Sequence, residues 1–137
     1  MPARPSHTFP LEEVPAGTAT ARQVLIGPDQ GPNFALRKFI IEPGGGMPLH
    51  TNTVEHEQYV LRGRARVVLG DEVVEVKKDD VVYIPGGLPH SYEALGDEPF
   101  EFLCAVPNLP DEIMVLPASG ADEEVEGLVV PEDIMGC

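Results

Sequence analysis

The amino-acid sequence predicts an all-β protein, folded as a sandwich or a closed barrel, and two observations support this fold class. Short runs of Val, Ile, Leu and Phe follow one another along the 137 residues, and turn residues, including 15 prolines and 14 glycines, separate them. Many short apolar runs at close, regular spacing are typical of sandwiches and barrels. No segment longer than a turn has the apolar period of a helix, so we expect strands alone to build the core.

The predicted elements follow in order along the chain. Residues 1–20, rich in Pro, Ala and Thr, are interpreted as an N-terminal arm, and residues 21–107 as the barrel. Gly, Pro and Asp mark the turns between its strands. The expected strands are 23–26, 34–42, 47–52, 56–62, 64–69, 72–77, 81–84, 88–94 and 99–106. Residues 108–137 form an acidic C-terminal extension, which is a loose segment, an extra edge strand or an arm in a dimer.

Charge and hydropathy exclude several classes of partner. The net charge is −14, and from Asp79 onward the chain has 14 acidic residues and no Lys or Arg. Nucleic acids and anionic membranes bind clustered Lys and Arg, so we expect neither as a partner. No apolar run approaches the roughly 18 residues that a membrane helix needs, and the start of the chain has no apolar signal-peptide core. The expected localisation is cytoplasmic.

Three of the four histidines, His50, His56 and His90, fall in strands or beside turns from which they can converge. Neutral imidazoles are common ligands for divalent transition metals. Three histidines that leave coordination positions open are typical of catalytic rather than structural sites. We therefore expect one divalent metal ion at these residues. The alternative is that each is an ordinary core or surface histidine.

Strand alternation predicts which side chains accompany the histidines. Residues two apart on a strand share a face, so Asn52 should lie beside His50. A chain reversal at Val54 would pair Asn52 with His56, and His50 with Gln58.

A second reversal, at residues 96–98, would set His90 opposite Cys104 and Tyr92 opposite Phe102. For Cys104, packing in an apolar core is the alternative to a place in the pocket. The predicted pocket residues are thus Asn52, Gln58, Tyr92, Phe102 and Cys104.

These motifs make the sequence similar to the cupin superfamily. The first cupin motif is matched by Gly44, His50, Asn52, His56 and Gly63. The second motif, Pro-x-Gly-x-x-His, is matched by Pro85, Gly87 and His90, with Ala94 at the usual Asn position. The resemblance covers about residues 33–106 and implies a single-domain jelly-roll barrel with its metal inside.

Two positions depart from the cupin pattern. His56 stands where the usual ligand is Glu, which resembles a subgroup of small cupins that bind metal with four histidines. Asn52 replaces the second histidine of that subgroup, and it either ligates the metal through its amide oxygen or hydrogen-bonds a metal-bound water. The expected metal ligands are His50, His56 and His90, with Asn52 near the ion. The resemblance favours Mn or Fe, with Zn or Ni as alternatives.

Three neutral imidazoles leave the charge of the ion uncompensated, so we expect a small anionic substrate that binds through oxygen. The resemblance favours an oxidoreductase, a metal-dependent oxygenase similar to the dioxygenases among cupins. Two alternatives stay open: a non-redox cyclase, isomerase or lyase, and a cupin that binds a small molecule without catalysis. Cupins commonly dimerise, and residues 34–41 and 81–84 have apolar side chains on both faces. We therefore also expect a homodimer.

Overall fold

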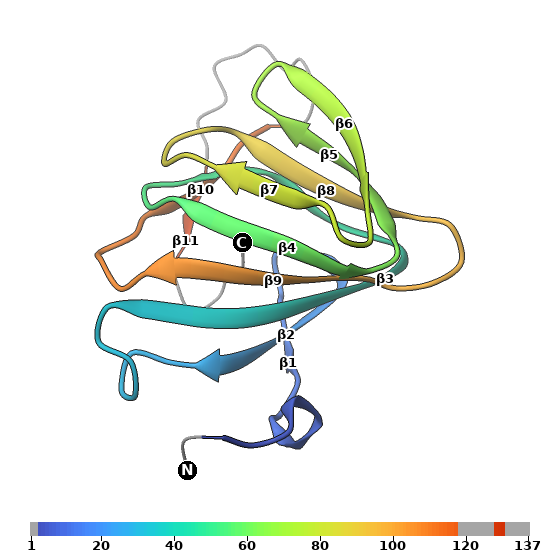
Figure 1. The fold of residues 1–137 in the computed structure, drawn as a ribbon. Helices are drawn as coiled ribbons and strands as arrows, with labels where there is room; N and C mark the ends of the chain where they lie inside the picture. The colour runs from blue at the N-terminus through green and yellow to red at the C-terminus, as the bar shows by residue number, and fades with distance from the viewer. Residues whose placement is uncertain (1–2, 118–127, 131–137) are drawn as a thin grey trace.

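The computed structural model describes residues 3–117 and 128–130, and the side chains of residues 3–117. Most of these residues lie in strands, and the helical structure among them is a single 3-10 turn, η1 (Ser6–Thr8) (Figure 1). The all-β prediction is therefore confirmed for the described residues. No helix in this part of the chain has the length and apolar character needed to cross a membrane.

The strands differ in length, from two residues to nineteen. In chain order they are β1 (Glu12–Glu13), β2 (Thr18–Ile26), β3 (Phe34–Asn52), β4 (His56–Arg62), β5 (Arg64–Leu69), β6 (Glu72–Lys77), β7 (Val81–Ile84), β8 (His90–Leu95), β9 (Phe100–Pro107), β10 (Ile113–Val115) and β11 (Leu128–Val130).

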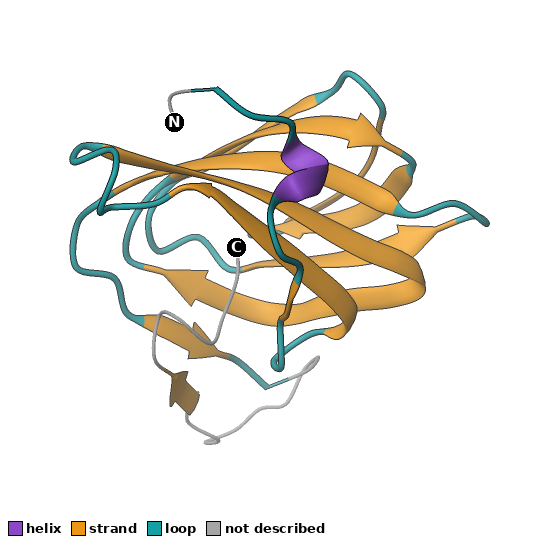
Figure 2. Ribbon diagram, turned by 90° about the horizontal axis from the view of Figure 1, so that it is seen from below, coloured by secondary structure: helices purple, strands orange, loops and turns teal. Residues whose placement is uncertain are grey.

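The long strand β3 joins the two halves of a curled antiparallel sheet. Its first part pairs with β2 and β9, and its second part pairs with β8 and β10. Around β3 the order of the sheet is β6-β5-β8-β3-β9-β4-β7. The sheet curls so that its two halves face each other across a common interior (Figures 1 and 2).

Glycines allow β3 to pass from one half of the sheet to the other. Gly44 has φ +84°, a left-handed conformation that favours glycine. A Cβ at Gly46 would lie 2.3 Å from the backbone oxygen of Tyr92, so only glycine permits this close approach of β3 and β8. These residues correspond to the turn that the sequence predicts between residues 42 and 47. In the structure they are a bend within one continuous strand.

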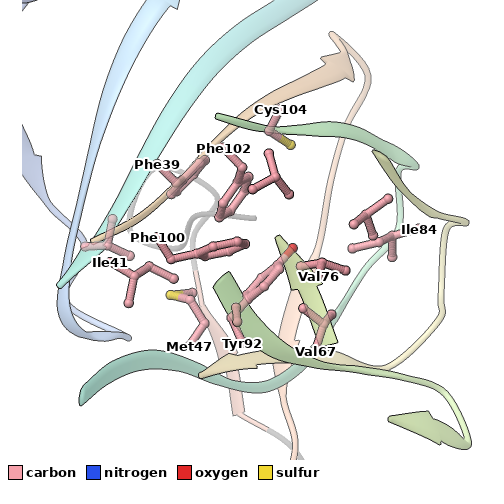
Figure 3. Packing of buried hydrophobic residues seen from close by; sticks show 14 of the residues in the cluster. Phe39, Ile41, Met47, Val67, Val76, Ile84, Tyr92, Phe100, Phe102 and Cys104 are labelled. Carbon is pink, nitrogen blue, oxygen red and sulfur yellow. The ribbon is translucent and has the colours of Figure 1, made fainter. Parts of the chain in front are cut away.

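Aromatic side chains fill the interior beside the histidines. Phe39, Phe100, Phe102 and Tyr92 point toward one another from β3, β8 and β9 (Figure 3). The ring centroid of Phe102 lies 5.3 Å from that of Phe39 and 5.1 Å from that of Tyr92. Each of these side chains is buried. The alternation along β9, where every second side chain is buried, is the period of two expected of a strand with one face inside.

The ends of the predicted barrel differ from the observed strands. β2 begins at Thr18, inside the predicted N-terminal arm, and pairs with β3. β10 pairs with residues 50–52 of β3, so residues 113–115 are an extra strand of the sheet, one of the three alternatives for the C-terminal extension. Residues 118–127 and 131–137 of that extension lie outside the described part.

The predicted pairing of His50 with Gln58, and of His90 with Cys104, is wrong. Strand β4 pairs with β7 and β9, while β8 pairs with β3 and β5. The physical reason is that the second part of β3 lies with β8 in one half of the sheet, whereas β4 and β9 lie together in the other half. The short connections after β3 and β8 therefore cross the barrel instead of closing hairpins.

Candidate metal centre

The structure brings the three predicted histidines together inside the barrel. His50 lies near the end of β3, and His56 and His90 begin β4 and β8. Each is at most 1% exposed. His50 and His90 are direct cross-strand partners. Their ring centroids are 4.2 Å apart, and those of His56 and His90 are 6.1 Å apart.

Local backbone contacts fix the orientation of two of the rings. Nδ1 of His50 lies 2.7 Å from the carbonyl oxygen of Pro48, and Nδ1 of His90 lies 2.9 Å from that of Leu88. A carbonyl oxygen only accepts, so Nδ1 carries the hydrogen in both rings. Nε2 is then the basic nitrogen, which is the atom that binds a metal.

Burial keeps two of the imidazoles in the form that a metal requires. Burial is the main cause that lowers the pKa of His56 well below its ordinary value, and the positive charge of Arg37 contributes next. Burial, followed by the nearby His50, lowers the pKa of His90 to about 3. Both rings are therefore neutral at pH 7, and only neutral imidazole binds a metal ion.

Three buried polar atoms at this site lack a hydrogen-bond partner among the described residues. They are Nε2 of His56, Nε2 of His90 and Oδ1 of Asn52. Leaving such an atom unsatisfied costs about 1–3 kcal/mol, so a native protein satisfies it with a ligand, an ion or water. Two imidazole nitrogens and an amide oxygen are a donor set that a divalent transition metal accepts.

The distances between the histidine rings are close to those expected when two imidazoles bind one ion, but they do not match them. Among the described residues, no group of three or more His, Cys, Asp or Glu side chains holds its donor atoms in a metal-binding arrangement. Two imidazoles bonded to one ion at about 2.1 Å would have ring centroids about 5 Å apart. The observed separations of 4.2 and 6.1 Å lie on either side of this value. The donor set therefore fits a metal, and small shifts of the rings are required to bind it.

Asp111 is a site residue that the sequence analysis missed. Its Oδ2 accepts a hydrogen bond of 3.3 Å from Nδ2 of Asn52. Its Oδ1 accepts from the backbone N–H of Thr53 at 2.7 Å and from that of Val54 at 3.3 Å. Asp111 thus fixes the turn after β3 and orients the Asn52 amide. No local pattern could reveal this, because Asp111 lies 59 residues after Asn52 in sequence.

The remaining predicted pocket residues also lie in this interior. Nε2 of Gln58 donates to Oη of Tyr92 at 2.7 Å and lies 3.8 Å from the sulfur of Cys104. That sulfur is 3.4 Å from Nδ1 of His56. The ring of Phe102 stacks on that of Tyr92. The predicted faces were therefore correct although the predicted strand partners were not, and the roles of these residues stay predictions.

Arg37 is a second residue that the sequence analysis missed. It lies on β3 with 8% of its surface exposed, on the interior face that Phe39 shares. Its Nη2 is 3.9 Å from the sulfur of Cys104. Strand alternation contained the signal, since Arg37 is two residues before the buried Phe39. A cavity of about 310 Å³ adjoins it, lined by Arg22, Val24, Pro28, Ala35, Arg37, Val106 and Asn108.

Comparison with known proteins identifies relatives in both sequence and structure. Residues 37–106, half of the chain, match the cupin domain family. The 1-methylthio-D-xylulose 5-phosphate methylsulfurylase of Rhodospirillum rubrum is 36% identical over 100 residues, which are 69% of this chain and 64% of that protein. This chain covers less than two thirds of the curated relatives that it matches, 61% in the case of an uncharacterized protein from Methanocaldococcus jannaschii.

Two solved structures resemble this one over most of its length. The polyketide cyclase RemF from Streptomyces resistomycificus superposes with a TM-score of 0.74 at 26% identity, covering 98% of this chain and 89% of the cyclase. A cupin-2 domain protein from Rhodospirillum rubrum superposes with a TM-score of 0.70 at 32% identity, covering 81% of this chain and 74% of that protein.

Proposed function

This chain belongs to the cupin family, with its jelly-roll barrel, and from that premise we propose that it is a metal-dependent enzyme acting on a small, oxygen-chelating organic substrate. His50, His56 and His90 would hold one divalent ion, with Asn52 beside it. The observation that carries the proposal is the pair of neutral imidazoles, those of His56 and His90, whose buried Nε2 atoms have no hydrogen-bond partner among the described residues.

An ion held by neutral imidazoles keeps its full positive charge, so it would polarise a carbonyl or stabilise an enolate oxygen of the substrate. The chain's own polar groups would orient the substrate. Gln58 donates to Oη of Tyr92, so the hydroxyl hydrogen of Tyr92 can be donated to a substrate oxygen. Burial raises the pKa of Tyr92, which keeps that hydrogen in place. Phe102 supplies an apolar wall against which a carbon skeleton can pack.

Non-redox chemistry is the better supported form of this function. The structural likeness to a polyketide cyclase extends over 98% of the chain, and cyclisation is a reaction in which a metal needs only to act as a Lewis acid. The oxygenase that the sequence favoured is the second candidate. Its support is the all-histidine donor set, which the resemblance associates with Fe and Mn.

Pentane-2,4-dione, a small β-diketone, tests this function directly. We expect its enolate absorption to appear when it is added to the full chain loaded with Zn, Ni, Mn or Fe. The signal should be lost in His56→Ala and kept in His7→Ala, which removes an exposed histidine in the N-terminal segment. Oxygen uptake with the Fe or Mn form would select the oxygenase. The absence of enolate with all four metals would contradict the proposal.

A further inference from the structure

Gln58 and Tyr92 form a hydrogen bond across the interior of the barrel. Gln58 lies on β4 and Tyr92 on β8, which belong to opposite halves of the curled sheet. Nε2 of Gln58 donates to Oη of Tyr92 at 2.7 Å, and the two residues are 5% and 3% exposed. The hydroxyl of Tyr92 points into the interior (Figure 3). The hydrogen bond therefore holds this hydroxyl at one place inside the barrel.

Strand alternation places this pair in the layer next to the histidines. Gln58 follows His56 by two residues on β4, and Tyr92 follows His90 by two residues on β8, so all four side chains face the interior. The ring of Tyr92 meets that of His90 edge-on, with the centroids 5.9 Å apart. Buried apolar residues surround the pair on its other sides: Val60, Val67, Val82 and Ala94. The pair is thus a polar floor beneath the three-histidine site.

The hydroxyl hydrogen of Tyr92 has no acceptor within the described part of the chain. The hydrogen bond from Gln58 is the one that Tyr92 makes there, and in it Tyr92 is the acceptor. An amide nitrogen only donates, so the hydrogen of the hydroxyl has to point away from Gln58. A buried donor without an acceptor is costly, and native proteins satisfy it with a ligand or water.

Gln58 restricts what can satisfy this hydroxyl. A tyrosine hydroxyl without partners can donate or accept. The amide of Gln58 occupies its accepting side, so that only a donor is left for a ligand. A ligand oxygen without a hydrogen completes the arrangement, whereas a ligand O–H or N–H would face the hydrogen of Tyr92. Sites built in this way discriminate strongly, because the wrong ligand leaves buried polar groups unpaired.

We propose that Gln58 determines substrate specificity. By donating to Tyr92 it makes the site select substrates that present a bare oxygen to the hydroxyl, such as the enolate of a 1,3-dicarbonyl compound, and reject those that present an O–H or N–H. The inference rests on the proposed function, since the bound metal would bring the ligand oxygen within reach of Tyr92. Gln58 acts through Tyr92 and is therefore a positioning residue.

Raman spectroscopy of the metal-free full chain tests the direction of the hydrogen bond without any ligand. The ring doublet of tyrosine distinguishes a hydroxyl that accepts from one that donates. The chain has three tyrosines, and the difference between wild type and Tyr92→Phe isolates Tyr92. We expect an accepting Tyr92 in the wild type and loss of this signature in Gln58→Leu. A purely donating Tyr92 in the wild type would overturn the inference.

Two probes that differ in one group test the selection itself. Pentane-2,4-dione binds as an enolate with two bare oxygens, and 4-aminopent-3-en-2-one has an amino group in place of one of them. Calorimetry with the metal-loaded chain gives the ratio of the two affinities, and comparing this ratio between variants cancels the metal's own preference for oxygen. We expect the preference for the diketone to fall about tenfold in Gln58→Leu and in Tyr92→Phe.

The double variant shows whether Gln58 acts through Tyr92. Adding Gln58→Leu to Tyr92→Phe should cause no further loss of preference, since the hydroxyl is already absent. Val82→Ala is the matched control, because Val82 is the direct partner of Gln58, is 6% exposed and has no polar side-chain atom. It should keep the wild-type preference. An unchanged preference in Gln58→Leu that thermal unfolding shows to be folded would overturn the inference, as would a further loss in the double variant.

The same measurements separate this inference from the proposed function. If pentane-2,4-dione binds the wild type, is lost in His56→Ala and is preferred equally in Gln58→Leu, the proposed function holds and the role of Gln58 is rejected. A wild type that binds neither probe with any of the four metals would contradict the proposed function and, with it, the substrate selection. A Raman signature that depends on Gln58 would then support only the direction of the hydrogen bond.

Discussion

The neutral, buried histidines make the stability of the metal-free protein depend on pH. The unfolded chain regains an ordinary histidine pKa near 6.5, whereas the pKa of His90 is about 3 in the folded state and that of His56 is also well below 6.5. Below pH 6.5 the unfolded state therefore binds more protons than the folded state. The stability that comes from keeping these rings neutral is complete above pH 6.5 and is lost as the pH falls toward 3.

Urea unfolding of metal-free protein between pH 7.5 and 5 checks this expectation. Below pH 6 the unfolding free energy of the wild type should fall as the pH is lowered. In His90→Gln this fall should be smaller by about 1 kcal/mol per pH unit. Carboxylates titrate alike in both proteins, so the difference between them isolates His90. His7→Gln, at an exposed position, should leave the slope unchanged. Equal slopes for wild type and His90→Gln would show that His90 is not buried in its neutral form.

The Asp111 carboxylate is expected to support both the turn after β3 and the metal centre. Asp111→Ala leaves the backbone N–H groups of Thr53 and Val54 without their acceptor, which should cost about 1–3 kcal/mol of unfolding free energy. It also frees the Asn52 amide, so metal affinity should fall about 10–100-fold, as for other residues that orient the surroundings of a metal. Metal titration and urea unfolding should show no such loss in Glu112→Ala. Equal behaviour of the two variants would exclude a positioning role for Asp111.

Among the strands, the alternation of side chains correctly predicts which face of the sheet a residue occupies, but it does not predict which strands pair. The strands at 56–62, 64–69, 72–77 and 81–84 have the predicted bounds, because Gly, Pro and Asp mark their ends. The faces of Gln58 and Cys104 were also predictable, since each is fixed by its neighbours two residues away. Their partnership was not, because it depends on which strands of the two sheet halves lie side by side.

The aromatic face of β9 is expected to contribute strongly to stability. Phe102 is 1% exposed and packs between Phe39 and Tyr92. Phe102→Ala removes these contacts and leaves a cavity, so we expect a loss of about 3–5 kcal/mol in urea unfolding. Leu103→Ala, one residue along on the outer face, should cost less than half as much. A cost for Phe102→Ala no greater than that for Leu103→Ala would contradict the interior place of this face.

At the scale of the whole molecule, the site depends on segments that are distant in sequence. The three histidines were predictable from their spacing and from the family resemblance. The residues that support the histidines were not predictable. Asp111 and β10 come from the predicted C-terminal extension, and β10 pairs with residues 50–52. The division into residues 1–20, 21–107 and 108–137 stays a prediction, although strands from both outer parts join the sheet.

We propose that the expected homodimer forms through the outer face of β4 and β7. Tyr59 and Val81 are cross-strand neighbours there and are 43% and 73% exposed, and Tyr83 is 57% exposed. Light scattering should give twice the chain mass for the wild type and a monomer for Val81→Glu. Val73→Glu, at an apolar residue of β6 that is 62% exposed, should remain dimeric. A monomeric wild type, or a dimeric Val81→Glu, would contradict this interface.

We claim that His50, His56 and His90 hold one metal ion, and elemental analysis of the full, untagged chain purified without chelators is the decisive measurement. We predict close to one equivalent of a divalent transition metal in the wild type and in His7→Ala, and a loss of most of it in His56→Ala and His90→Ala. A wild-type chain that holds no metal, even after incubation with Mn, Fe, Ni and Zn, would contradict the claim.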